Sequence, residues 1–190
     1  GVGLALGGGL HDEDVRVRRV VAEVLSRAYM QVELATPDIL AGLRDPDPEV
    51  RAFLLEALTR IDVDSEEAMT AVLGLLEEDS TRDAAVAALD RASRVPADAL
   101  PGLLKALGSE DDWVRRNVAA CMRKVGVAAV QTLSEAVRRE RGTTRLAAMD
   151  VLSQFGEEAG SASPVLVEAL CDRDLEVRCA AARALGAIGV

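Results

Sequence analysis

The sequence predicts an all-α protein built from about six helical hairpins that stack one on the next. An arginine preceded by valine or threonine returns at nearly even steps along the whole chain. Apolar residues follow each of these arginines with the spacing of one helix face. Hydrophobic residues make up 49% of the chain but aromatic ones only 2%, and small aliphatic side chains favour closely packed helices over a sheet.

The arginine column sets the period of the repeat. Successive arginines are separated by 33, 31, 33, 30 and 33 residues. A period of this size indicates a supersecondary unit that buries its apolar face only by stacking on its neighbours. The Val or Thr and its arginine are Val17-Arg18, Val50-Arg51, Thr81-Arg82, Val114-Arg115, Thr144-Arg145 and Val177-Arg178.

A helix is predicted to begin just before each pair, because an acid stands three residues ahead of the Val or Thr in five of the six units. An acidic side chain there accepts hydrogen bonds from free backbone N–H groups and lies at the favourable end of the helix dipole. In the remaining unit Arg141 takes this place. Eight residues after the Val or Thr, a large apolar residue continues the buried stripe. The acids are Asp14, Asp47, Glu78, Asp111 and Asp174, and the apolar residues are Leu25, Leu58, Leu89, Met122, Leu152 and Leu185.

A second amphipathic segment precedes each of these helices, so each unit is predicted to contain two helices. The pattern is clear in LPGLLKAL at 100–107 and SPVLVEAL at 163–170. A column of prolines falls where the first turn of the first helix is expected. A column of glycines falls just after the second helix, where a left-handed C-cap favours glycine. The prolines are Pro37, Pro101 and Pro164, and the glycines are Gly126, Gly156 and Gly189.

The chain is predicted to form a single repeat domain over residues 1–190. Its first hairpin is expected to be incomplete, because LALGGGL at 4–10 has glycines between Leu6 and Leu10 and should form a short or frayed helix. Neither terminal unit has a polar closing helix, so the array is expected to continue further or to contact another subunit there. The approximate units are 1–29, 30–62, 63–93, 94–126, 127–156 and 157–190.

Two segments carry a resemblance to a known family. DPDPEVRAFLLEALTRI at 45–61 and DRDLEVRCAAARALGAIG at 172–189 resemble the second helix of HEAT repeats, and most of all the short bacterial HEAT-like repeats first named for phycobilisome lyases. The resemblance implies a right-handed α-solenoid, an armadillo/HEAT-type superhelix, whose second helices line the concave side and serve mostly as a binding surface. It also implies that the column arginines pair with the acid three residues before Val in the neighbouring unit.

The arginine column is therefore interpreted as a structural ladder rather than as six phosphate-binding groups, because it recurs through every unit. Such charge-assisted bonds fix the register of the stack. Substitution of Arg115 is expected to loosen the stack. The ladder comprises Asp14, Arg18, Asp47, Arg51, Glu78, Arg82, Asp111, Arg115, Arg145, Asp174 and Arg178.

Candidate binding residues are sought at the exposed positions of the second helices. The residue before Val is polar in the other units but is Trp113, the only tryptophan, in the fourth. Exposed aromatic residues often anchor interfaces, although Trp113 could instead fold over its own repeat. Arg116, Arg123 and Lys124 follow on the same helix, and together these four residues are the candidate partner-binding site.

Residues 115–145 carry a local net charge of +6 in a chain whose net charge is −10. This basic stretch could dock an acidic partner, a nucleic acid or a phosphate-bearing ligand. Alternatively, its cations belong to the ladder or to helix C-terminal turns, where the dipole favours them. The acidic charge of the whole chain argues against general nucleic-acid binding. The basic side chains are Arg115, Arg116, Arg123, Lys124, Arg138, Arg139, Arg141 and Arg145.

No catalytic constellation is visible in the sequence, and neither a cofactor nor a metal is expected. His11 is the only histidine, which excludes His-based triads and paired-His zinc sites. Three cysteines without CxxC spacing and the absence of a long apolar run predict a cytoplasmic protein with no membrane span. The leading hypothesis is a non-enzymatic scaffold that binds an unidentified protein on its concave helical surface. A bilin-lyase-like enzyme subunit is a further alternative.

Overall fold

The computed structural model describes residues 2–27, 35–58, 65–76 and 78–189, and their contacts divide the chain into two compact units. The first unit is Gly1–Ser93 and the second is Arg94–Val190. Every regular element in the described residues is a helix, and no β-strand occurs among them, so the all-α prediction is confirmed. The junctions expected between the first three repeats, at 28–34 and 59–64, lie outside the described residues.

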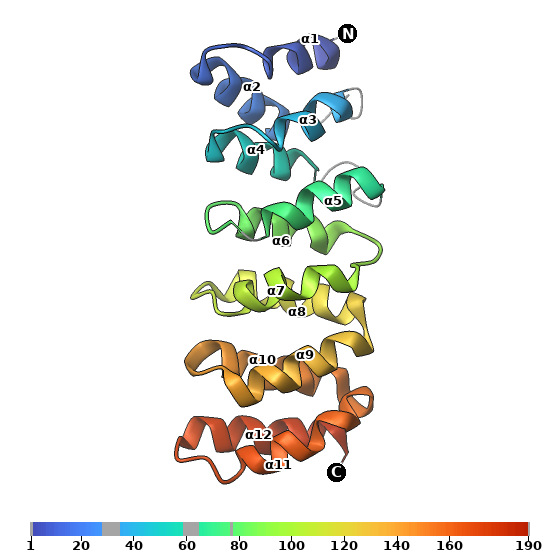
Figure 1. The fold of residues 1–190 in the computed structure, drawn as a ribbon, viewed down its shortest axis with the longest axis vertical. Helices are drawn as coiled ribbons and strands as arrows, with labels where there is room; N and C mark the ends of the chain where they lie inside the picture. The colour runs from blue at the N-terminus through green and yellow to red at the C-terminus, as the bar shows by residue number, and fades with distance from the viewer. Residues whose placement is uncertain (1, 28–34, 59–64, 77, 190) are drawn as a thin grey trace. The chain divides into compact units, whose positions relative to one another are not determined.

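The first unit contains three helical hairpins in succession (Figure 1). Each first helix packs against the second helix that follows it. The second helices also pack on one another, α2 on α4 and α4 on α6, and the first helices do the same, so the hairpins form two layers. The helices are α1 (Val2–Gly9), α2 (Val15–Arg27), α3 (Thr36–Gly42), α4 (Pro48–Leu58), α5 (Glu66–Leu75) and α6 (Arg82–Arg91).

The second unit repeats this arrangement with three more hairpins. The first helices α7, α9 and α11 form one layer, and the second helices α8, α10 and α12 form the other. Two 3₁₀ segments, η2 (Ala97–Ala99) and η3 (Gly156–Ala162), lead directly into first helices. The helices are α7 (Leu100–Leu107), α8 (Asp112–Val125), α9 (Val127–Arg139), α10 (Gly142–Phe155), α11 (Ser163–Ala169) and α12 (Leu175–Ile188).

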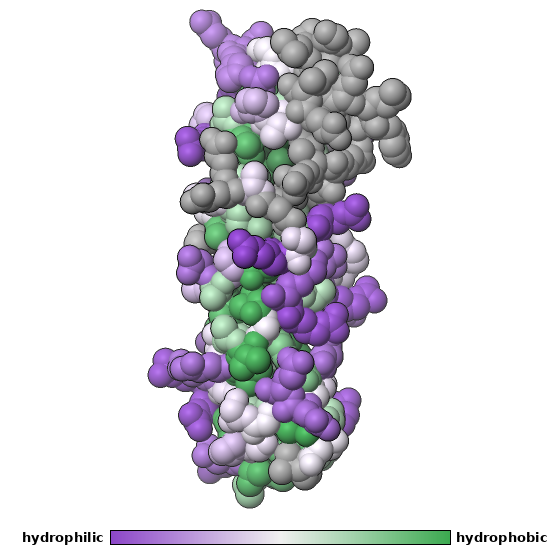
Figure 2. All heavy atoms as spheres, turned by 90° about the vertical axis from the view of Figure 1, so that its right-hand side faces the viewer, coloured by the Kyte–Doolittle hydropathy of each residue, from purple (hydrophilic) through white to green (hydrophobic). Residues whose placement is uncertain are grey.

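The core of the second unit lies between its two layers. Leu103 and Leu133 from the first helices and Val118 and Leu152 from the second are fully buried. In the lower half of Figure 2, where this unit is seen from the side of its inter-hairpin connections, hydrophobic residues gather along the middle and hydrophilic ones lie on both sides. The predicted apolar column is buried in all six hairpins, at Leu25, Leu58, Leu89, Met122, Leu152 and Leu185.

The predicted helix ends are present in the structure. The three column prolines occupy the first turns of α3, α7 and α11. The three column glycines end α8, α10 and α12 with φ values of 80°, 55° and 87°, of which only Gly189 is in the left-handed helical region. Four of the five acids cap a second helix, accepting hydrogen bonds from its first backbone N–H groups, and the acids that cap are Asp14, Asp47, Asp111 and Asp174.

The first hairpin has both of its helices, which corrects the expectation that it would be incomplete. Helix α1 spans eight residues and packs against α2 and α3 despite its glycines. Two of these glycines lie where another element approaches closely. A Cβ on Gly7 would lie 2.1 Å from the Asp38 carboxylate, and one on Gly9 would lie 2.8 Å from a methyl group of Val21. The glycines therefore allow α1 to lie close to its neighbours.

Candidate functional site

Each column arginine holds the turn of its own hairpin. The guanidinium donates a hydrogen bond to a backbone carbonyl six residues earlier in five hairpins, and eight residues earlier in the hairpin of α9 and α10. Carbonyls near a helix end lack an intrahelical donor, so the cation satisfies one of them at the negative end of the dipole. The hydrogen bonds run from Arg18 to the Asp12 carbonyl, from Arg51 to that of Asp45, from Arg82 to that of Leu76, from Arg115 to that of Ser109, from Arg145 to that of Val137 and from Arg178 to that of Asp172.

Three of these arginines also bind an acid of the next hairpin, always 27 residues later in the chain. Arg18 donates to Asp45 at 2.7 and 3.2 Å, Arg145 donates to Asp172 at 2.8 Å, and Arg51 pairs with Glu78. Only Glu78 stands three residues before its Val or Thr, as the family resemblance implied. The other two acids stand five residues before it, and in their hairpins the acid at three residues caps the helix.

Two carboxylates that bind an arginine of the preceding hairpin have a lowered pKa. Hydrogen bonds from the Arg19 guanidinium hold the pKa of Asp47 below its ordinary value. Their lengths are 3.0 and 2.6 Å, and they join the first two hairpins beside the Arg18 pair. The pKa of Asp172 is lowered first by the backbone N–H of Asp174 and next by Arg145. Both carboxylates are charged in the folded protein at neutral pH, as the ladder requires.

The remaining ladder arginines with an ion pair make it locally. Arg82 pairs with Asp79 at 2.6 Å, and Arg115 pairs with Asp112, in each case three residues earlier in the chain. Their guanidinium groups therefore serve the hairpin to which they belong. Each of the six ladder arginines thus donates at least one hydrogen bond to another group of the protein.

Helix α8 carries the candidate binding residues on one exposed face. The Trp113 side chain is 50% exposed, and Arg116 and Arg123 are exposed as well. Positions three and ten residues after Trp113 lie on the same side of an α-helix as Trp113 itself. Arg123 donates to the side-chain oxygen of Gln154 on α10 at 3.3 Å, which ties the far end of this face to the next helix. Lys124 is half-buried beside it.

A groove of about 320 Å³ runs between α8 and α10, and Arg116 lines it whereas Trp113 does not. Its apolar lining comes from both hairpins and consists of Leu107, Ala119, Ala147 and Val151. Exposed polar side chains stand along it, with Arg116 on α8 and with Asp150 and Gln154 on α10. The sequence did not predict this groove, because it arises only where two second helices pack together.

The basic stretch of the sequence is divided between the two layers of the second unit. Arg116, Arg123 and Lys124 lie on α8, in the layer of second helices, whereas Arg138 and Arg139 lie at the end of α9, in the layer of first helices. The structure therefore brings together the α8 residues, with Trp113 and Arg116 three residues apart, but does not gather all eight cations on one helix face.

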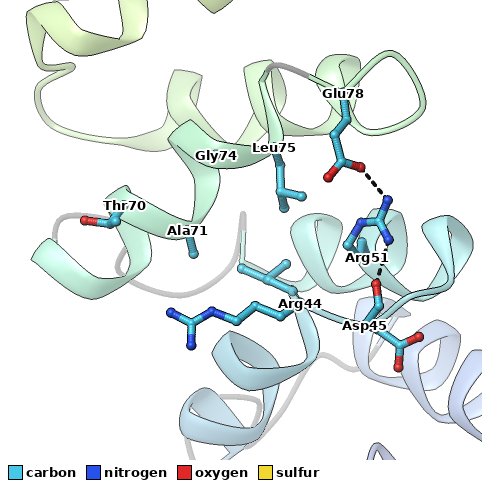
Figure 3. Close-up of a pocket in the computed structure, with 9 residues that line it drawn as sticks. Arg44, Asp45, Arg51, Thr70, Ala71, Gly74, Leu75 and Glu78 are labelled. Carbon is cyan, nitrogen blue, oxygen red and sulfur yellow. Dashed lines mark hydrogen bonds and ion pairs between the residues drawn. The ribbon is translucent and has the colours of Figure 1, made fainter.

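A larger groove, of about 660 Å³, lies in the first unit between α3 and α5 (Figure 3). Leu43 and Leu75 contribute apolar surface, and Arg44 reaches along the groove below α5. Arg51 lies at its end, between Glu78 and the Asp45 carbonyl, and its buried Nε–H has no acceptor among the described residues. The sequence did not predict this groove either, because no residue there departs from the repeat pattern.

Several structures are similar to the chain. An engineered protein covers 100% of the chain and 99% of its own length, with a TM-score of 0.57 and 19% identity. A designed armadillo repeat protein in complex with the peptide (KR)4 has a TM-score of 0.55 at 16% identity, over 97% of this chain and 98% of its own. The complex of CpcE and CpcF of phycocyanin lyase from Nostoc sp. PCC7120 has a TM-score of 0.57 at 20% identity, over 99% of this chain and 77% of the other.

Identities below 25% establish only the fold, which is the all-α solenoid predicted from the sequence. No curated protein is similar enough in sequence to count as a relative. The family model for HEAT repeats, in contrast, matches residues 5–90, 78–153 and 130–190, which together cover nearly the whole chain. The chain therefore belongs to the HEAT repeat family.

Proposed function

We propose that this protein is a non-enzymatic binding module that holds a segment of another protein along the groove between α8 and α10. The observation that carries the proposal is an apolar groove lined by α8 together with a half-exposed Trp113 on the same helix. An exposed tryptophan offers a large apolar area at low entropic cost, which is typical of interface hot spots.

The polar side chains along the groove define the chemistry of its occupant. Arg116 and Asp150 stand on opposite walls, and neither side chain has a hydrogen bond or ion pair within the described part of the chain. An acidic side chain of the partner would pair with Arg116, and a basic side chain or backbone N–H would pair with Asp150. Apolar side chains between them would pack on Ala119 and Val151. The preferred ligand is therefore a mixed-charge peptide segment with apolar residues.

Neighbours in fold support a protein or peptide partner in general terms. The designed armadillo repeat protein is solved with a peptide, and CpcE and CpcF form a complex with each other. The three cysteines are thiols rather than disulfides, and two of them are exposed, which favours a reducing compartment such as the cytoplasm for this role. No helix in the described ranges is long and apolar enough to cross a membrane.

The proposal is tested by selecting peptides from a random library on the whole chain and measuring their affinities by calorimetry. Trp113→Ala should weaken the selected peptides by roughly 30-fold, the effect of losing a hot-spot side chain. Arg116→Ala should weaken those that carry an acid. The control is Arg138→Ala, which removes an exposed arginine on α9 and should leave affinity unchanged.

Equal affinities for the Trp113→Ala variant and the unchanged chain would refute the proposal. Nucleic-acid or phosphate binding through the basic stretch is the competing function. It would appear as binding of oligonucleotides with a steep salt dependence that is lost on substitution of Arg116 and Arg123.

A further inference from the structure

The groove between α3 and α5 has a counterpart in the second unit, between the first helices α7 and α9. Gly74 of α5 lines the first groove, and Glu135 of α9 lines the second. Each stands two residues before the carbonyl that accepts the column arginine of its hairpin, which belongs to Leu76 in one case and to Val137 in the other. The two helices can therefore be compared in the same register.

The two grooves differ in the side chains that occupy them. Glu135 and Arg139 line the groove between α7 and α9 and form an ion pair at 3.6 Å, and the volume of this groove is about 220 Å³. Gly74 has no side chain in the place of Glu135, and the groove between α3 and α5 has a volume of about 660 Å³. A Cβ on Gly74 would meet nothing within 4 Å. The glycine therefore leaves space in this groove that a side chain takes in its counterpart.

The acids of the α3–α5 groove are already paired with arginines, whereas one of its arginines is not paired. Asp45 accepts hydrogen bonds from Arg18 at 2.7 and 3.2 Å, and Glu78 pairs with Arg51. Arg44 is exposed and reaches along the groove, and its guanidinium has no hydrogen bond or ion pair within the described residues (Figure 3). The buried Nε–H of Arg51 also has no acceptor there. The unpaired groups of the groove are therefore donors, which favours a negatively charged ligand.

Apolar side chains form the floor of the groove. Leu43 and Leu75 line it although they are only 2% and 5% exposed, and Ala71 lies beside them on α5. Grooves of about 300–1,000 Å³ with an apolar lining and a few polar groups are typical of sites for small molecules. The ligand that complements this groove therefore has an apolar body and one anionic group.

We infer that the α3–α5 groove binds a small organic acid, with its carboxylate on Arg44 and its apolar body against Leu43, Ala71 and Leu75. The space left by Gly74 holds part of that body. The site belongs to the layer of first helices in the first unit, whereas the groove between α8 and α10 lies between second helices of the second unit. The inference is therefore independent of the function proposed for the α8–α10 groove.

Titration of the ¹⁵N-labelled chain with octanoate, followed by nuclear magnetic resonance, tests the inference. Saturable shifts of the backbone amides of Ala71, Gly74 and Leu75 are expected. Gly74→Leu should abolish them, because the new side chain occupies the groove. This variant should be at least as stable in thermal melts, since leucine is the better helix former and a Cβ has room there. Arg44→Gln should raise the dissociation constant about fivefold, the effect of losing one exposed ion pair.

Three controls separate this site from other modes of binding. Arg91→Gln removes an exposed arginine of the same unit that does not line the groove, and it should leave the affinity for octanoate unchanged. Trp113→Ala should also leave it unchanged, because this residue lies in the other unit. Octylammonium has the same apolar chain with the opposite charge and should not bind. Absence of saturable shifts, equal affinity of the Gly74→Leu variant, or equal binding of octylammonium would each overturn the inference.

Discussion

Replacement of Arg145 by alanine should destabilise the second unit. The side chain is only 12% exposed, and it donates to the Val137 carbonyl at 2.8 Å and to Asp172 at 2.8 Å. A hydrogen bond from a charged donor to a neutral acceptor contributes roughly 1.5–3 kcal/mol, so the loss of the carbonyl bond sets the expected decrease in the free energy of unfolding. The loss of the ion pair with Asp172 adds no further decrease, because the Asp172 side chain is 23% exposed and still accepts a hydrogen bond from the Asp174 N–H.

Urea unfolding followed by tryptophan fluorescence is the appropriate assay, because the single tryptophan, Trp113, lies in the same unit as Arg145. Arg138→Ala provides the control, since this exposed α9 arginine should change the free energy of unfolding by less than about 0.5 kcal/mol. If the two variants were equally stable, the structural interpretation of the arginine column would be refuted. The column would then be free to bind phosphate groups, the interpretation set aside in the sequence analysis.

Three further predictions concern the helix ends, the ladder acids and the first helix. Asp174→Ala should cost about 1 kcal/mol in urea unfolding, because it removes the side-chain acceptor at the start of α12. The lowered pKa of Asp47 stabilises the fold above the unfolded value of about 3.9, and this stabilisation is lost as the pH falls through the folded pKa. Acid titration of Asp47→Asn should therefore show a weaker dependence of stability on pH in this range. Gly8→Ala should stabilise α1 by up to about 1 kcal/mol, because a Cβ there meets nothing within 4 Å. Gly9→Ala should not give this stabilisation, because its Cβ would lie too close to the Val21 side chain. Equal melting temperatures of the two variants would contradict the packing described for α1.

The repeat could be predicted from the sequence because each of its recurring features is a side-chain type at a fixed spacing. The Val and Arg columns, the capping acids and the prolines of the first turns each require a particular residue type at a fixed spacing. The bond from each arginine to a backbone carbonyl was not predicted, because any residue supplies a carbonyl. The acid partners Asp45 and Asp172 were missed although their signal was present, since both lie 27 residues after a column arginine. The 27-residue spacing was not recognised because other acids stand next to Asp45 and Asp172 in the sequence.

The site was predictable only in part. Trp113 departs from the polar residues of its column, so sequence comparison between units was sufficient to identify it. On the opposite wall of the groove, Asp150 stands in a column of mixed residues, and Gln154 stands where the first four units carry Arg or Lys, a departure that by itself does not indicate a groove. They were found only because α10 packs beside α8, and the width of the gap between two helices depends on the side chains at their contact. The same reason applies to the groove between α3 and α5.

The central claim is that the ladder arginines are structural and that binding occurs along the groove between α8 and α10. Nuclear magnetic resonance of the ¹⁵N-labelled chain, titrated with a peptide selected on it, tests this claim most directly. The account predicts shifts of the Trp113 indole N–H and of backbone amides on the facing sides of α8 and α10, including Arg116 and Asp150. Shifts confined to the groove between α3 and α5, or to the basic end of α9, would contradict it.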